Sequence, residues 1–436
     1  MISNFFENMV FEEMIVNLTW AQVMQKYGNV RLATPEDNEN ILAFMQSISM
    51  KTTEYEVRYS RTPSFFSLHK LQGTEVLTFL FFGKSGVIQG IASLVFRLSY
   101  VRGIEQVVGY LQDLRMSPNA ERRVLDSFFK FYADTVRMAP YTSELHNCNF
   151  FYTAIISGNI KALKVFSRSS FHFNYNKLTQ YKTYFWPVNH LMALGRFVGR
   201  KNNLNKSWFF SQGTDADTQE LKEFLHLQNK SRLFGYNFSE ATGKPFSVAS
   251  EKPEAQNFSL KYADTWEQMC AARPQFGAHD FIICRNADKK IIACVALLEA
   301  SSERKLELSQ PSKSMQMQIK LLNLISSRNF APNKALNTLY LSFLEIDRNA
   351  SPQDRTILAR NLVAYTFRNP KVVKYDFLSY LHFDDDFIFE KPFLVPCIIS
   401  EGSLFRVYHD DHVTLPRFVD GFLRPGESPA LDALLA

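Results

Sequence analysis

Cysteine and glycine are scarce in this chain of 436 residues. The five cysteines (Cys148, Cys270, Cys284, Cys294 and Cys397) are odd in number and show no Cys-x-x-Cys spacing. A disulfide framework or a thiolate zinc site is therefore not expected, and a reducing compartment is the simpler interpretation. Glycine and proline number 17 each, against 40 phenylalanines. This composition is typical of a globular protein with large cores and excludes a fibrous or disordered chain.

A cationic leader and a long apolar run are also lacking. The N-terminal segment contains Glu7, Glu12 and Glu13 and has no basic start of the kind found in secretory signals. The most apolar window, 79–96, is interrupted at 83–86 by Gly-Lys-Ser-Gly, which favours two strands around a tight turn over a membrane-spanning helix. We therefore expect a cytoplasmic protein without a membrane span.

Net charge and short motifs give little direct indication of function. The formal net charge is +6 at pH 7, which permits an anionic partner but requires none, and we do not expect a nucleic-acid partner. The motifs GxSxG, HExxH and GxGxxG do not occur. The two histidines of the sequence HDDH, His409 and His412, would face opposite sides of a strand, so no metal site is expected.

The same order of elements is expected twice along the chain: strand, helix, hairpin, strand, helix, strand. In the first copy the hairpin, the long strand and the later strand are expected at 75–100, 106–116 and 150–156, with an amphipathic helix after Pro118. In the second copy the opening strand, hairpin, long strand and later strands are expected at 258–263, 280–300, 336–346, 372–383, 393–399 and 404–408. A polar insertion near 301–334 separates the second hairpin from its long strand.

Three motifs stand out in the first copy: RLATPED at 31–37, YLQDLRMSP at 110–118 and GNIKALKVF at 158–166. They resemble motifs of the GNAT superfamily of N-acetyltransferases. The segment 110–118 resembles the central strand of the family and the turn into its CoA-binding helix. The segment 31–37 resembles the opening strand and first helix, and 158–166 resembles the later N-x-x-A segment. The resemblance covers about 30–186, whereas the second half shares mainly the order of its elements.

The resemblance implies an α/β (α+β) fold with two GNAT-like domains, each a mixed, mostly antiparallel sheet flanked by helices. We predict an N-terminal GNAT-like domain at 1–195, a polar and basic linker at 196–215, and a degenerate C-terminal GNAT-like domain at 216–436. The first domain is the better candidate for binding an acyl-CoA.

The resemblance also implies a site for acetyl-CoA or another acyl-CoA as a co-substrate. In the family a bulge in the central strand leaves backbone groups free to pair with pantetheine, and the start of the next helix offers amides to the pyrophosphate. Asp113 stands where the family is often acidic and is the candidate general base, with a purely structural carboxylate as the alternative. The candidate cofactor-binding residues are Leu114, Met116, Arg122, Arg123, Val124 and Asn159.

Some positions depart from the family pattern or have a simpler explanation. The phosphate loop of the family is rich in glycine, whereas 121–126 reads ERRVLD. Many members place a tyrosine acid where this chain has Phe166, and a phenyl ring cannot protonate a thiolate. Arg122 and Arg123 can equally form the solvated face of a helix, and Asn159 can be a helix N-cap.

Three functions are left open by these observations. We expect an N-acyltransferase that moves an acetyl or longer acyl group from acyl-CoA to an amine of unknown identity. The first alternative is a non-catalytic GNAT-like protein that binds a ligand or partner, which the missing glycines and Phe166 favour. The second is a Fem-like aminoacyl transferase, since those ligases also contain tandem GNAT-like folds, but the long basic helical arm is absent.

Overall fold

The computed structural model describes residues 20–51, 56–101, 103–166, 173–188, 207–239, 263–300, 303–309, 311–325, 331, 334–384, 397–409 and 428–430. The N-terminal segment, residues 196–206 of the expected linker and residues 258–262 of the expected opening strand lie outside these ranges. So does His412 of the HDDH sequence. Within the described residues, no helix combines the length and apolar character needed to cross a membrane.

The first half of the chain contributes eight strands and five helices to the described structure. The strands are β1 (Val30–Leu32), β2 (Met50–Lys51), β3 (Glu56–Ser60), β4 (Glu75–Phe82), β5 (Ile88–Val101), β6 (Ile104–Met116), β7 (Phe150–Ile156) and β8 (Phe173–Pro187). The helices are α2 (Trp20–Lys26), α3 (Asn38–Ser47), α4 (Ser67–Gln72), α5 (Arg122–Met138) and α6 (Ile160–Phe166).

The second half contributes nine strands and four helices to the described structure. The strands are β9 (Phe209–Gln212), β10 (Gly235–Tyr236), β11 (Phe281–Arg285), β12 (Ile291–Glu299), β13 (Lys305–Ser309), β14 (Ala335–Leu336), β15 (Thr338–Ile346), β16 (Phe377–Phe383) and β17 (Ile398–His409). The helices are α8 (Thr218–Lys230), α9 (Thr265–Ala272), α10 (Lys313–Ile325) and α11 (Pro352–Phe367).

In the first copy the expected order of elements is confirmed, with β2, β3 and α4 added between the first helix and the hairpin. In the second copy the opening strand expected at 258–263 is not confirmed, because residues 258–262 lie outside the described ranges and β9 has the place in the sheet that β1 has in the first copy. The separation of the last two expected strands, 393–399 and 404–408, is wrong, because Ile398–His409 is one continuous strand; residues 393–396 lie outside the described ranges. The strand expected from residue 372 begins only at Phe377, since Val372–Lys374 forms a 3-10 turn. Part of the segment expected as a linker, Phe209–Gln212, is strand β9 and pairs with β11. The boundaries of the two domains stay a prediction.

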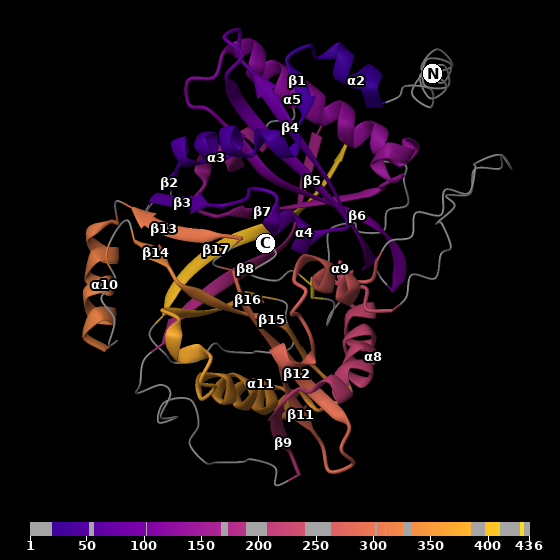
Figure 1. Cartoon of the computed structure of the whole chain (residues 1–436), viewed down its shortest axis with the longest axis vertical. Coiled ribbons are helices and arrows are strands. Elements are labelled where there is room, and N and C mark those ends of the chain that lie inside the picture. Colours follow the sequence, from indigo (N-terminus) through magenta and orange to yellow (C-terminus); the bar gives the residue numbers. More distant parts are fainter. Residues whose placement is uncertain are drawn as a thin grey trace, which may run out of the picture.

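One mixed sheet runs through both halves of the protein (Figure 1). Its strand order is β1-β4-β5-β6-β7-β17-β8-β16-β15-β12-β11-β9. The order is symmetric about its centre: counted inward from the two ends of the sheet, β1 corresponds to β9, β4 to β11, β5 to β12, β6 to β15 and β7 to β16. The halves exchange their last strands: β17 pairs with both β7 and β8, and β8 pairs with β16. This exchange joins the two copies into a single sheet.

The two copies also agree residue by residue around their long central strands. Asp113 in β6 and Phe343 in β15 both have a left-handed backbone, with φ of +53° and +49°. The strand ends and the following helix starts have the same spacing. Three equivalent pairs are each 230 positions apart: Asp113 and Phe343, Met116 and Ile346, and Arg122 and Pro352.

Helices cover both faces of each half of the sheet. Along β4, Phe79 and Phe81 belong to the core under α5, whereas Leu80 between them belongs to the core under α3. The alternation follows from strand geometry, in which successive side chains point to opposite faces. In the second half α11 covers one face and α8 the other. Along β11, Ile282 belongs to the core under α11 and its neighbour Phe281 to the core under α8.

A second sheet connects the two halves on one side of the molecule. Its order is β14-β13-β3-β2, and β3 of the first half pairs antiparallel with β13 of the second, Tyr59 standing opposite Leu306. The polar insertion expected near 301–334 supplies β13 and α10. The insertion therefore brings residues of the second half next to β3 of the first.

Candidate functional site

The central strands of the first half, β6 and β7, run parallel and then separate. They pair over three residues, the last being Tyr110 opposite Tyr152, although both strands continue beyond this point. Where they part, the hydroxyl of Thr153 donates to the Leu111 carbonyl at 2.8 Å. Beyond it, the facing edges of the two strands are not joined by a ladder. This gap between neighbouring strands is where a ligand can reach backbone groups.

A bulge in β6 accompanies the separation. The register against β5 shifts between Ile91 and Ser93, so that Asp113 and Leu114 together stand opposite Ala92. Asp113 takes the extra residue's left-handed conformation, which aspartate tolerates better than most other non-glycine residues. A bulge bends the strand that carries it and re-aims its side chains. The bulge expected near Leu114 from the family resemblance is present.

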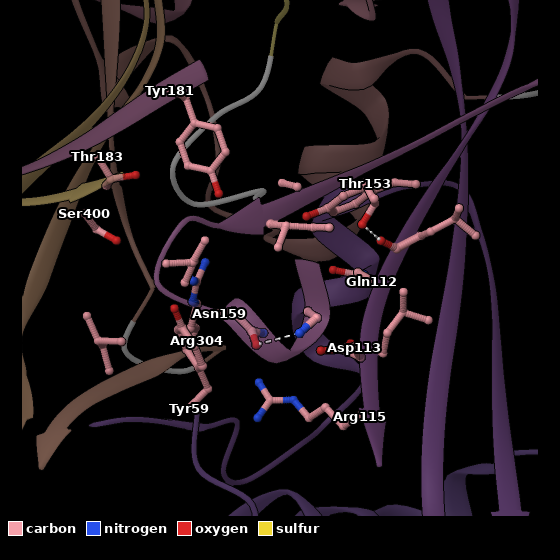
Figure 2. A pocket seen from close by; sticks show the side chains of 18 of the residues that line it. Tyr59, Gln112, Asp113, Arg115, Thr153, Asn159, Tyr181, Thr183, Arg304 and Ser400 are labelled. Atoms are coloured by element: carbon pink, nitrogen blue, oxygen red, sulfur yellow. Dashed lines mark hydrogen bonds between the residues drawn. The ribbon is translucent and has the colours of Figure 1, made fainter. Parts of the chain in front are cut away.

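A cavity with a volume of about 190 Å³ occupies the gap. Strands β6 and β7 and the start of α6 form one part of its wall, and β3, β8, β13, β15 and β17 contribute the rest, so both halves of the chain line it (Figure 2). Its polar lining residues include Tyr59, Gln112, Asp113, Arg115, Thr153, Asn159, Tyr181, Thr183, Arg304 and Ser400.

Asp113 is held in a buried ion pair at the wall of this cavity. Its two carboxylate oxygens lie 2.8 and 2.9 Å from the guanidinium nitrogens of Arg61, and the side chains are 5% and 7% exposed, respectively. Nε2 of His69 lies 2.9 Å from Oδ2 of Asp113. Burial raises the pKa of the Asp113 carboxyl, but the charge of Arg61 and the hydrogen bond with His69 outweigh burial and hold it well below its usual range. The carboxylate is therefore ionised at neutral pH.

The other charges of the cavity wall are positive. The guanidinium carbons of Arg115 and Arg304 lie 5.6 and 4.6 Å from the ring centroid of Tyr59. Burial lowers the pKa of Arg115, and the neighbouring guanidinium groups add to this effect although Asp113 opposes it. The described lining residues thus carry three guanidinium groups, including Arg61, and one carboxylate.

The predicted site residues of the strand and of α6 lie at the cavity. Asp113, Leu114 and Asn159 line it, whereas Met116 ends β6 outside the lining. Asn159 also caps α6, because its Oδ1 accepts a hydrogen bond from the amide of Ala162 at 3.2 Å (Figure 2). Asn159 is therefore a helix cap that also lines the cavity, and its contact with a cofactor stays a prediction.

The predicted residues at the start of α5 lie outside the cavity lining. Arg122 and Arg123 are exposed, and Nε of Arg123 lies 3.0 Å from the Glu121 carboxylate. The other oxygen of Glu121 accepts from the backbone amide of Lys84 at 2.8 Å. The amide of Val124 donates to the Glu121 carbonyl at 2.9 Å, and its side chain is buried. The charge of Glu121 is thus engaged, and Arg122 has no polar partner among the described residues.

Several cavity residues were missed from the sequence. Arg115 stands two positions after Asp113 in YLQDLRMSP, so its place in the motif was a usable signal. Arg61 and Arg304 carried no local signal, because they reach the cavity from the end of β3 and from the insertion. Of Phe166 only the backbone, at the end of α6, is described.

The equivalent region of the second copy is occupied by side chains. β15 and β16 also run parallel over three residue pairs and then part, but Phe343 replaces Asp113 at the bulge. Its ring packs edge-on against Tyr236 at a centroid distance of 5.2 Å. Two residues further, Glu345 is buried and paired with Arg232 at 3.0 Å. The second copy thus lacks the carboxylate at its bulge and has there an aromatic ring in the core, followed two residues later by a buried ion pair.

Comparison with protein-family models and with curated proteins finds no match to this sequence. Among solved structures, a GCN5-related glucosamine N-acetyltransferase region of a fungal multi-domain GH3 β-N-acetylglucosaminidase aligns over 86% of this chain, with 11% identity and a TM-score of 0.51. This chain spans 38% of the length of that one. Saccharomyces cerevisiae N-myristoyltransferase with bound myristoyl-CoA aligns over 87% of this chain and 82% of its own, with 11% identity and a TM-score of 0.48.

At such low identity a structural likeness establishes the fold alone. The first of these alignments agrees with the bulged central strand, the parting of β6 from β7 and the repetition of both features in β15 and β16. The chain therefore has the fold of the GNAT superfamily, in two tandem copies that exchange their last strands.

Proposed function

We propose that the protein is an N-acyltransferase that binds an acyl-CoA in the first copy and transfers its acyl group to an amine. The observation that carries this proposal is the parting of β6 and β7 beside the bulge, with a polar cavity in the gap. The facing strand edges offer N–H and C=O groups to an amide-bearing arm such as pantetheine. The second copy, which has Phe343 in place of Asp113 at its bulge, serves as a partner in the shared sheet.

The reaction would take place at the inner end of the gap. The amine nitrogen attacks the thioester carbonyl carbon, a C–N bond forms, the C–S bond breaks and the thiolate leaves with the electron pair. The amine must lose a proton and the thiolate must gain one. Asp113 remains the candidate base because its carboxylate is ionised at the cavity wall, but its pairing with Arg61 weakens it as a base and favours the structural alternative. Tyr181, whose hydroxyl points into the cavity, is the candidate acid (Figure 2).

The start of α5 is the candidate site for the pyrophosphate of the CoA. The first amides of a helix and its dipole favour an anion. Arg122 adds an exposed positive charge, and the engagement of Glu121 by Lys84 and Arg123 limits its repulsion. Backbone groups near Leu114 and Met116 would hold the pantetheine arm.

Calorimetric titration with acetyl-CoA and with a long-chain acyl-CoA tests this proposal. We expect the wild type to bind at least one of them and Arg122→Glu to bind it about tenfold more weakly or worse, because a favourable charge becomes a repulsive one. Arg360→Glu, an exposed arginine of α11 in the second copy, is the matched control and should bind as the wild type does. No binding of either ligand at millimolar concentration contradicts the proposal.

A non-catalytic ligand-binding role is the second candidate. It is favoured by the buried pairing of Asp113 with Arg61, which leaves no strong base among the described cavity residues. Thiol release from the bound acyl-CoA in the presence of a panel of amines separates the two functions. Turnover with any amine supports the transferase, and binding without turnover on the whole panel supports the ligand-binding role.

A cytoplasmic location stays a prediction, supported by five cysteines that are all free thiols.

A further inference from the structure

The cavity contains more positive charge than its own residues neutralise. Arg61 is paired with Asp113 through both carboxylate oxygens, which uses the single carboxylate found among the described lining residues. Arg115 and Arg304 both lie against the ring of Tyr59. We call these two arginines and Tyr59 the cationic wall; Arg115 extends from β6 toward the side where Tyr59 and Arg304 lie (Figure 2).

Arg115 is the clearest unsatisfied group of the cationic wall. Its Nη1 is buried and has no hydrogen-bond partner among the described residues. A buried cation without an anion is costly, and it is retained where a ligand completes its interactions. Burial lowers the pKa of Arg115 and the neighbouring guanidinium groups add to this effect, although the charge of Asp113 opposes it.

The cationic wall is assembled from both halves of the chain. Tyr59 lies near the end of β3, Arg115 lies near the end of β6, and Arg304 precedes β13 in the insertion of the second half. The pairing of β3 with β13 holds Arg304 at the cavity. The phosphates of a CoA are expected at the start of α5, which does not line the cavity, so we expect the Nη1 donor of Arg115 to meet a different anion.

We propose that the cationic wall binds a carboxylate carried by one of the two substrates, either on the acceptor beside its amine or at the end of the acyl group. A guanidinium presents paired N–H donors that match the two oxygens of a carboxylate. The ring of Tyr59 lies within cation–π distance of both guanidinium groups and can hold them in place. That the carboxylate belongs to a substrate rests on the proposed function. The binding of a carboxylate by the cationic wall can be measured without turnover.

Titration with succinate and with its neutral diamide, succinamide, tests the anion site directly. We expect the wild type to bind succinate more tightly than succinamide, and Arg115→Met to lose about tenfold or more of its affinity for succinate alone. Arg58→Met is the matched control, because Arg58 is exposed on β3 next to Tyr59 and should leave the preference intact. No preference for succinate in the wild type, or an equal preference in Arg115→Met, overturns the proposal.

The folding of the variants is checked by thermal unfolding without ligand. Arg115→Met should unfold no earlier than the wild type, because it removes an unpaired charge and keeps an apolar stem of similar length. Should Arg115→Met fail to fold, Arg115→Lys keeps the charge without the planar fork; it should bind succinate more weakly than the wild type, and wild-type affinity overturns the proposal.

Two pairs of substrates identify which molecule carries the carboxylate. With acetyl-CoA, thiol release is compared for β-alanine and its neutral amide; with a neutral amine, it is compared for succinyl-CoA and butyryl-CoA. Preference for the charged member of one pair, lost in Arg115→Met, assigns the carboxylate to that substrate. Turnover of the neutral members with no charged preference in either pair overturns the inference. Absence of thiol release in every arm counts against the proposed function alone, since the succinate titration still decides the anion site.

Discussion

Replacement of Asp113 by asparagine separates the structural part of this site from its chemistry. Asparagine keeps the size of the side chain and tolerates the left-handed backbone of this position, where φ is +53°. The substitution removes the charge that pairs with Arg61 and leaves this buried guanidinium without its carboxylate partner. The fold at the bulge is thus retained while the electrostatic balance is changed.

The expected loss of stability follows from the geometry of the pair. Both side chains are less than a tenth exposed, and both carboxylate oxygens contact the guanidinium. Breaking a buried pair from one side costs about 3–5 kcal/mol, because the remaining charge stays buried and uncompensated. The double variant Arg61→Met/Asp113→Asn removes both charges and should be less destabilised than the sum of the single variants.

Urea-induced unfolding, followed by circular dichroism, measures these free energies. Asp126→Asn is the control, because Asp126 is exposed on α5, and it should change the free energy of unfolding by less than about 0.5 kcal/mol. A loss below about 1 kcal/mol for Asp113→Asn, or strict additivity in the double variant, would refute the reasoning. If turnover is found, a folded Asp113→Asn enzyme with reduced kcat, unchanged KM and an altered pH profile would instead assign Asp113 as the base.

Three further outcomes are expected. Phe343→Ala, which removes the ring packed on Tyr236, should lower the free energy of unfolding by about 3 kcal/mol and leave acyl-CoA affinity unchanged; weaker binding would show that the second copy takes part in the site. Burial lowers the pKa of His146 to about 4. In the unfolded chain the histidine pKa is near 6.5, so between pH 6.5 and pH 4 the unfolded state binds a proton that the native state does not bind. The free energy of unfolding should therefore fall by about 1–2 kcal/mol as the pH is lowered from 6.5 to 4, after allowance for the partial exposure of the ring. The loss on acidification, measured by urea unfolding, should be smaller in His146→Asn than in the wild type and unchanged in His279→Asn, whose histidine is exposed; equal pH slopes contradict the assignment. Tyr181→Phe should lower kcat about a hundredfold without changing acyl-CoA binding, and wild-type turnover excludes the phenol as the acid.

Local patterns in the sequence determined the elements and one side of the site. The stripe of Val124, Phe128, Tyr132 and Val136 predicted α5, and all four side chains are buried. The motif YLQDLRMSP indicated the bulged strand, so that Asp113 and Leu114 were expected where the structure has them. Such features follow from interactions between near neighbours and from the burial of one face, which leave a period in the sequence.

Only the tertiary structure decided how the two copies are joined and what completes the cavity. The exchange of β8 and β17 depends on pairing between strands more than two hundred residues apart, and strand periodicity does not state a partner. The short strand β9 was hidden in a polar segment for the same reason. Arg61 and Arg304 are distant in sequence from the motif YLQDLRMSP, and the pairing of β3 with β13 brings them to the same cavity. Their roles arise from long-range packing, which brings charges together that the sequence keeps apart.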